Sequence, residues 1–126
     1  RRGGKSLCVS IVMKGKEIDL NDGILKVFIE QIRPKKIEVR KQLDMGYSWD
    51  GSVALLYEIR PQWDKPENIL HHEFAKIRYY KSRGEWNLYW MRASGKWEAY
   101  EPYPVATHLQ ELLEVIKEDK YHCFFG

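Results

Sequence analysis

Residues 74–100 read FAKIRYYKSRGEWNLYWMRASGKWEAY, and this stretch decides the fold. It contains three segments, 74–81, 86–92 and 96–100, whose aromatic and aliphatic content is typical of strands. Two short polar turns join these segments, Ser82-Arg83-Gly84-Glu85 and Ser94-Gly95. Strands that follow one another through such short turns pair antiparallel. The stretch therefore predicts a three-stranded antiparallel meander.

Another pair of predicted strands precedes the meander. Residues 37–49 and 53–60 flank Asp50-Gly51, a dipeptide that tolerates the positive φ angles of a tight hairpin turn. Gly46 predicts a bend or bulge in the first of these strands. Pro61 is expected to end the second strand, because proline lacks the N–H of a ladder donor. Residues 61–72, which contain two prolines, are predicted to form a long connecting loop.

Amphipathic helices are predicted before and after the strands. Asp19 is a suitable N-cap for the first helix, and Pro34 ends it. Its expected core stripe is Ile24, Val27, Phe28 and Ile32, widened by Leu25 and Ile29. Thr107-x-x-Gln110 predicts a capping box for the second helix. Its apolar face is Leu109, Leu112, Leu113 and Ile116, and it ends near Asp119.

These elements predict an α+β fold. Two helices with apolar stripes need a sheet face to cover, which gives two layers. We therefore expect a roughly five-stranded antiparallel sheet with N- and C-terminal helices. The 126 residues suffice for one hydrophobic core and are too few for two independent ones.

Composition places the chain among soluble globular domains, with 44% hydrophobic and 31% charged residues. No apolar run approaches the roughly 20 residues that a membrane-spanning helix needs, so we expect no membrane association. Cys8 and Cys123 are too few for a disulfide framework. Free thiols without an export signal predict a cytoplasmic location.

The formal charge of +3 comes from the first residues of the chain. Arg1, Arg2 and Lys5 are bases in a segment, 1–12, that has no acid, so residues 13–126 hold 18 bases and 18 acids. Because Met13 is a plausible start, we interpret residues 1–12 as an upstream extension or cloning remnant, expected to be disordered, and residues 13–126 as a single domain. A net charge of zero is weaker than the basic footprint of typical nucleic-acid-binding domains.

A basic and aromatic surface is predicted on the sheet. If both helices cover one face, the other face is open. From the alternation within strands, we expect the open face to carry Glu58 and Tyr80 together with the binding candidates Arg60, Lys76, Arg78, Trp90 and Arg92, with Trp63 in the adjoining loop. Aromatic rings and guanidinium groups on a sheet can bind a protein partner, a second copy of the chain, or nucleic acid, or can simply stabilise the sheet.

Three hypotheses of function remain open at this point. The preferred one is a non-catalytic interaction module that binds a protein partner or associates with itself. The first alternative is a metal-dependent phosphodiester hydrolase that uses Asp44, Glu58 and Lys76, since two acids and an amine on neighbouring strands can hold Mg²⁺ and orient water. The second is a nucleic-acid-binding domain, although the chain lacks the glycine-aromatic signature of an RNA-recognition motif.

Other chemistry has weaker support in the sequence. His71-His72 and His122-Cys123 could bind zinc, but adjacent histidines rarely point at one ion, so we expect no metal site. Cys123 and His122 are neighbours, which places the histidine poorly as a base for the thiol. No G-x-S-x-G, G-x-G-x-x-G or phosphate-loop motif is present, and we expect no cofactor.

The residues from Glu58 onward resemble a known family. The matching segments are Tyr57-Glu58-x-Arg60-Pro61-x-Trp63, Ala75-Lys76-x-Arg78-Tyr79-x-Lys81, Trp86-x-Leu88-Tyr89-Trp90-x-Arg92, Lys96-Trp97, Tyr100-Glu101-Pro102 and Cys123-Phe124-Phe125-Gly126. They are similar to a family of small uncharacterised bacterial proteins known only as a domain of unknown function. The family commonly has an acid and a histidine where this chain has Ser94 and Glu98. The resemblance implies no activity.

Overall fold

The computed structural model describes residues 11–13 and 16–125. In chain order, the elements are β1 (Ile11–Met13), β2 (Lys16–Ile18), α1 (Leu20–Ile32), α2 (Ile37–Arg40), β3 (Asp44–Trp49), β4 (Val53–Gln62), β5 (Lys65–Tyr80), β6 (Glu85–Met91), β7 (Trp97–Ala99), β8 (Val105–Ala106) and α3 (Leu109–Glu118).

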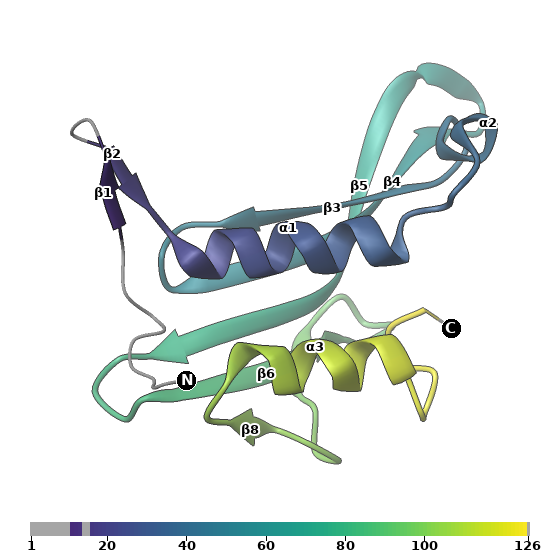
Figure 1. Cartoon of the computed structure of the whole chain (residues 1–126). Helices are drawn as coiled ribbons and strands as arrows, with labels where there is room; N and C mark the ends of the chain where they lie inside the picture. Colours follow the sequence, from purple (N-terminus) through teal and green to yellow (C-terminus); the bar gives the residue numbers. More distant parts are fainter. Residues whose placement is uncertain (1–10, 14–15, 126) are drawn as a thin grey trace.

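The main sheet is antiparallel, with the strand order β3-β4-β5-β6-β7, and β8 pairs with β6 as well. Helices α1 and α3 lie side by side on one face of it (Figure 1). The predicted α+β fold with terminal helices is therefore confirmed. β1 and β2 form a separate small hairpin. Most of the predicted extension, residues 1–10, lies outside the described residues, and the interpretation of residues 1–12 stays a prediction.

The core lies between the helices and one face of the sheet. Leu25, Phe28 and Ile29 of α1 are buried, as are all four apolar residues predicted for α3. The sheet contributes Ala54, Leu56, Ala75, Ile77, Trp86 and Leu88. Val27 was expected in the stripe, but its side chain is 59% exposed. The α1 stripe is centred on Leu25, Phe28 and Ile29, which turns Val27 toward solvent.

Hydrogen bonds at its first turn attach α1 to the edge strand β3. The carboxylate of Asp19 accepts the backbone N–H of Asn21, as predicted for an N-cap, and also accepts the indole N–H of Trp49. The hydroxyl of Tyr47 donates to the Asp22 carboxylate at 2.8 Å. These bonds fix the helix over the sheet edge that it covers.

The segment before the first hairpin differs from its prediction. Residues 37–40 form the helical turn α2 instead of a strand, and Ile37 and Val39 face solvent. β-branched residues suggested a strand, but Arg40 donates to the Pro34 carbonyl at 2.7 Å and closes the turn. Gly46 pairs in register with Tyr57, so it makes no bulge. It instead leaves space for the ring, because a Cβ on Gly46 would lie 2.7 Å from Tyr57 Cε1.

The predicted loop 61–72 is also wrong, because β4 and β5 continue through most of it. In a two-stranded ribbon, each strand pairs along one edge and leaves the other edge free. A proline whose backbone nitrogen lies on the free edge therefore removes no hydrogen bond between the strands. The register shifts between Pro61 and Gln62, near the turn.

The capping box of α3 is one residue later than expected, with His108 as the N-cap and Glu111 accepting its backbone N–H at 3.2 Å.

The segment after α3 docks on the core. Asp119 has a left-handed backbone with φ of 45°, and its buried carboxylate accepts the backbone N–H groups of Phe124 and Phe125 at 3.0 and 2.9 Å. Phe124 is buried against Tyr100, and Phe125 packs on Phe74. The turn thus directs both rings onto the sheet, which completes the core at that end.

Candidate functional site

The side of the sheet that faces away from α1 and α3 carries a cluster of aromatic, apolar and basic side chains. The pairs Lys76–Leu55, Lys76–Tyr89, Arg78–Asn87 and Met91–Trp97 place these residues on one face. In the described part of the chain, none of the residues that we assign to this face is fully buried. We call it the open face and define it by Val53, Leu55, Tyr57, Ile59, Lys76, Arg78, Tyr80, Asn87, Tyr89, Met91 and Trp97.

Two tyrosines and three cations form the centre of the open face. The Lys76 ammonium lies 5.4 Å from the ring centre of Tyr89, and the Arg78 guanidinium lies 5.1 Å from that of Tyr80. Arg83, in the β5–β6 turn, lies 4.2 Å from the Tyr80 ring. The two phenol oxygens are 3.3 Å apart and share a hydrogen bond. Cation–π contacts of this kind hold the rings and the charged groups in a fixed arrangement.

The charge of this cluster is only partly neutralised. Arg83 pairs with Glu85 at 3.1 Å. Among the described residues, no ion pair involves Lys76 or Arg78. Two cations that have phenol rings, but no carboxylate within ion-pair distance, among their described neighbours favour the approach of an anionic group to the middle of the sheet.

The cluster shifts the acidity of its tyrosines in opposite directions. The hydrogen bond from Tyr89 lowers the pKa of Tyr80, and the charges of Arg78, Arg83 and Lys76 lower it further because they stabilise the phenolate. Burial raises the pKa of Tyr89, and its hydrogen bond to Tyr80 adds to the effect. Tyr80 is therefore the first of the pair to ionise as the pH rises.

We expect Tyr89→Phe to raise the pKa of Tyr80, because the largest cause of the shift is the lost hydrogen bond. Titration of the ring ¹³Cζ resonance of Tyr80 measures this directly. Arg78→Gln, which keeps the hydrogen bond, is expected to raise the pKa by less. The assignment is wrong if Tyr80 titrates at the same pH in the wild type and in Tyr89→Phe.

The structure brings only some of the predicted binding residues together. Lys76 and Arg78 lie on the open face, as expected. Trp90 lies opposite the buried Ala75 and packs against the core, so the prediction that Arg78 and Trp90 share a face is wrong. The reason is the register, which pairs Arg78 with Asn87.

The remaining predicted residues also lie apart from the open-face cluster. Glu58 and Arg60 have the alternation of the helix side and pair with each other at 3.1 Å. Arg92 follows β6 and pairs with Glu98 at 2.8 Å. Trp63 lies in the β4–β5 turn with 91% of its side chain exposed. The sequence analysis did not select Tyr89 and Arg83 as binding residues. Their positions relative to Tyr80, on the other side of a four-residue turn or within it, could have indicated that they lie near its ring.

The three residues of the hydrolase hypothesis do not converge. Both carboxylate oxygens of Asp44 bind the Arg33 guanidinium, at 2.8 and 2.9 Å, and this pairing lowers the pKa of Asp44. Asp44 pairs with Ile59, whereas Lys76 pairs with Leu55, four residues or about 13 Å further along β4. Within residues 19–125, no three His, Cys, Asp or Glu side chains are grouped to hold a metal ion.

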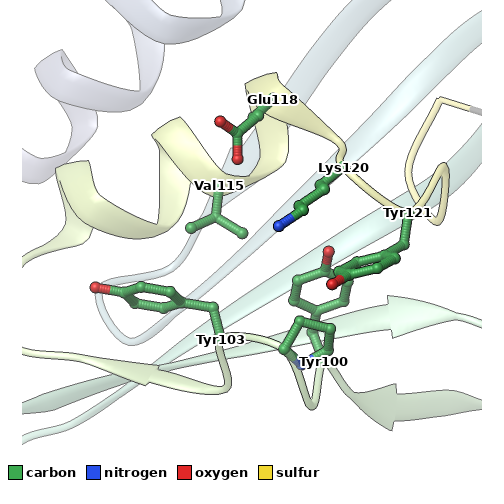
Figure 2. A pocket seen from close by; sticks show the side chains of 7 residues that line it. Tyr100, Tyr103, Val115, Glu118, Lys120 and Tyr121 are labelled. Carbon is green, nitrogen blue, oxygen red and sulfur yellow. The ribbon is translucent and has the colours of Figure 1, made fainter.

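A cavity of about 200 Å³ lies between α3 and the segment after β7. It is lined by Tyr100, Pro102, Tyr103, Val115, Glu118, Lys120 and Tyr121 (Figure 2). The Lys120 side chain extends between the tyrosines (Figure 2), and its ammonium lies 5.7 Å from the Tyr121 ring. Nearby, burial raises the pKa of the Cys123 thiol, which disfavours the thiolate that a nucleophile needs. The walls of this cavity come from residues 100–103 and 115–121, and no sequence motif in these two segments indicated it.

In the described part of the chain, no helix is long and apolar enough to cross a membrane. The fold and the open face define a class of protein, a small α+β domain in which the helices of residues 16–125 cover one side of the antiparallel sheet.

The chain belongs to a particular family of such domains, the Domain of unknown function (DUF3024) family, whose sequence model matches residues 13–126. This confirms the resemblance to a domain-of-unknown-function family. Neither the comparison with curated proteins nor the comparison with solved structures found a match.

Proposed function

We propose that the protein is a non-catalytic interaction module that binds a partner with negative charge through its open face. The observation that carries this proposal is the pair Lys76 and Arg78, which lie at the centre of the sheet face opposite α1 and α3 and, among the described residues, contact phenol rings instead of carboxylates. We expect the module to work in the cytosol, where a free thiol such as that of Cys123 stays reduced.

The composition of the open face supports binding. Tyrosine, tryptophan, methionine and arginine are enriched in protein interfaces, because they supply large contact areas together with polar groups. The open face presents Tyr57, Tyr89, Met91 and Trp97, all partly exposed, around its two cations. The cation–π contacts place Lys76 against Tyr89 and Arg78 against Tyr80 before a partner arrives, which reduces the entropy that these four side chains lose on binding.

Affinity capture tests this proposal. The purified protein is immobilised and incubated with a lysate of its source cells, and the bound proteins and nucleic acids are quantified. We expect Arg78→Glu to lower recovery at least about 10-fold, because it places like charge against an anionic partner. Lys117→Glu, on the exposed side of α3, is the charge-matched control. Equal recovery with both variants contradicts the use of the open face.

A further inference from the structure

The cavity beside α3 is bounded by two tight turns. In the first turn, the backbone N–H of Tyr103 donates to the Tyr100 carbonyl at 3.1 Å. In the second, the backbone N–H of His122 donates to the Asp119 carbonyl at 3.0 Å. The two turns bring the rings of Tyr100, Tyr103 and Tyr121 to the same cavity (Figure 2). Its volume of about 200 Å³ exceeds the roughly 30 Å³ that one water molecule takes in the liquid, so a small organic ligand fits.

Contacts outside the cavity fix two of these rings. Tyr100 is 2% exposed, and its ring packs on Phe124 with the ring centres 4.9 Å apart. The Tyr103 hydroxyl donates to the Glu111 carboxylate at 3.2 Å. A ligand therefore meets two aromatic rings that are already in place, which reduces the entropy lost on binding.

The surroundings of the cavity are acidic. Residues 101–126 hold five acids and two bases. Val115 and Glu118, which line the cavity, belong to the last turn of α3, and the C-terminal end of a helix carries partial negative charge. Burial raises the pKa of Tyr100, and the charges of Asp119 and Glu118 are among the groups that raise it further. These negative charges favour a cation over an anion in the cavity.

A cation of the chain itself, Lys120, already lies in this environment. Its side chain extends between the tyrosines, and its ammonium lies 5.7 Å from the Tyr121 ring centre (Figure 2). The face of an aromatic ring attracts a cation within about 6 Å of its centre. In the described part of the chain, no ion pair involves Lys120. The cavity therefore accepts a cation, and the flexible lysine side chain can leave it without breaking such a pair.

A methylated ammonium ion suits these walls better than a primary ammonium does. The ammonium of a lysine is strongly hydrated, so it loses favourable contacts with water when it moves between rings. Methyl groups weaken this hydration and contact the ring faces, which is why aromatic cavities recognise quaternary ammonium groups. Pro102 and Val115 add apolar contacts to the same cavity.

We propose that this cavity binds a small methylated ammonium ion, which replaces the ammonium of Lys120 between the tyrosines. The rings of Tyr100, Tyr103 and Tyr121 surround the methyl groups, and the carboxylate of Glu118 complements the charge. The site is independent of the proposed function, because α3 lies on the side of the sheet that faces away from the open face.

Titration of the full chain with choline, followed by the ring proton resonances of Tyr103 and Tyr121, tests this proposal. The matched neutral probe is the alcohol that has a carbon atom in place of the choline nitrogen. We expect saturable shifts with choline, with a dissociation constant at least about 10-fold lower than that of the alcohol. Acetate is expected to leave both tyrosines unchanged, and choline is expected to leave Tyr89 on the open face unchanged.

Substitution of Lys120 tests whether its ammonium occupies the site. Lys120 is exposed, so Lys120→Ala is expected to keep the fold. We expect this variant to lower the dissociation constant of choline at least about 5-fold, because the ligand no longer has to displace an ammonium. Lys117→Ala removes the same charge from the exposed side of α3 and is the control, with an expected change below about 2-fold.

Substitution of Tyr121 tests the role of the rings. Tyr121 is 56% exposed, and Tyr121→Leu keeps an apolar side chain but removes the aromatic face. We expect the dissociation constant of choline to rise at least about 5-fold in this variant. Tyr80→Leu, on the open face, is the matched control and is expected to bind choline like the wild type.

A short peptide that carries trimethyllysine shows whether the cation belongs to a protein or to a free molecule. Binding tighter than that of choline supports the first source, and weaker binding supports the second.

Three results overturn the proposal. Equal affinities for choline and the neutral alcohol would mean that the cavity is only apolar. Shifts with acetate that are lost in Lys120→Ala would mean that the cavity binds anions. Absence of choline binding in both the wild type and Lys120→Ala would exclude a ligand of this class.

Discussion

Replacing Trp86 by alanine is expected to lower the free energy of unfolding by about 3–5 kcal/mol, the largest effect of any single substitution considered for this domain. Trp86 is 2% exposed and packs between Trp49 and Tyr79, with ring centres 5.9 and 4.6 Å away. Removal of the indole leaves a cavity where β3, β5 and β6 meet the helices. Small domains are stable by only about 5–15 kcal/mol, so this variant should be close to unfolding at 37 °C.

Urea denaturation in dilute solution measures this effect, and Trp63→Ala is the matched control. It removes the same side chain from the exposed turn between β4 and β5 and is expected to change the free energy of unfolding by less than about 0.5 kcal/mol. Similar losses for Trp63→Ala and Trp86→Ala would show that Trp86 is not in the core, and would contradict the assignment of the covered face.

Replacing Asp119 by alanine is expected to cost about 2–4 kcal/mol, because one change removes two interactions. The buried carboxylate of Asp119 accepts the backbone N–H groups of Phe124 and Phe125, which lose their partners in the variant. Alanine also adopts the left-handed backbone of this position at a cost of roughly 1 kcal/mol. We expect the amide hydrogens of Phe124 and Phe125 to exchange with solvent much faster.

Glycine and asparagine at position 119 separate these two contributions. Asp119→Gly loses the hydrogen bonds without backbone strain, and Asp119→Asn keeps one acceptor oxygen in a residue that tolerates the left-handed region. We therefore expect alanine to be the least stable of the three variants in urea denaturation, and asparagine the most stable. Unchanged exchange at Phe124 in Asp119→Ala would mean that the carboxylate does not hold this segment.

The sequence was sufficient to predict the helices and most of the sheet. Asp19 and Pro34 could be recognised as marking the start and the end of α1. The capping side chain of Asp19 and the missing backbone N–H of Pro34 both act locally, within one helical turn. The turns after Tyr80 and Met91 contain Gly84 and Gly95, which have positive φ and could be recognised from their residue type. By contrast, Pro61 and Pro66 suggested a loop where β4 and β5 continue, because the sequence does not show which edge of a strand is free of a hydrogen-bonded neighbour.

The binding surface could be predicted only in part, because it depends on register between strands. Alternation gives the residues that share a face within one strand, but a shift of one residue exchanges the faces of its neighbour. Both faces of β6 carry aromatic residues, Trp86 and Trp90 on one and Tyr89 on the other, so the pattern did not select between them. The pairing of Tyr80 with Glu85 determines which face of β6 belongs to the open face, and it places Tyr89 beside Lys76.

Hydroxyl-radical footprinting, read by mass spectrometry of the free protein and of the protein bound to the partner recovered by affinity capture, tests most directly whether the open face is the binding surface. We predict that Tyr89, Met91 and Trp97 are oxidised more slowly in the bound protein, while Tyr103 and Tyr121, exposed near α3, react at the same rate in both samples. Unchanged rates at the open-face residues, or protection of Tyr103 and Tyr121 instead, would contradict a binding role for this side of the sheet.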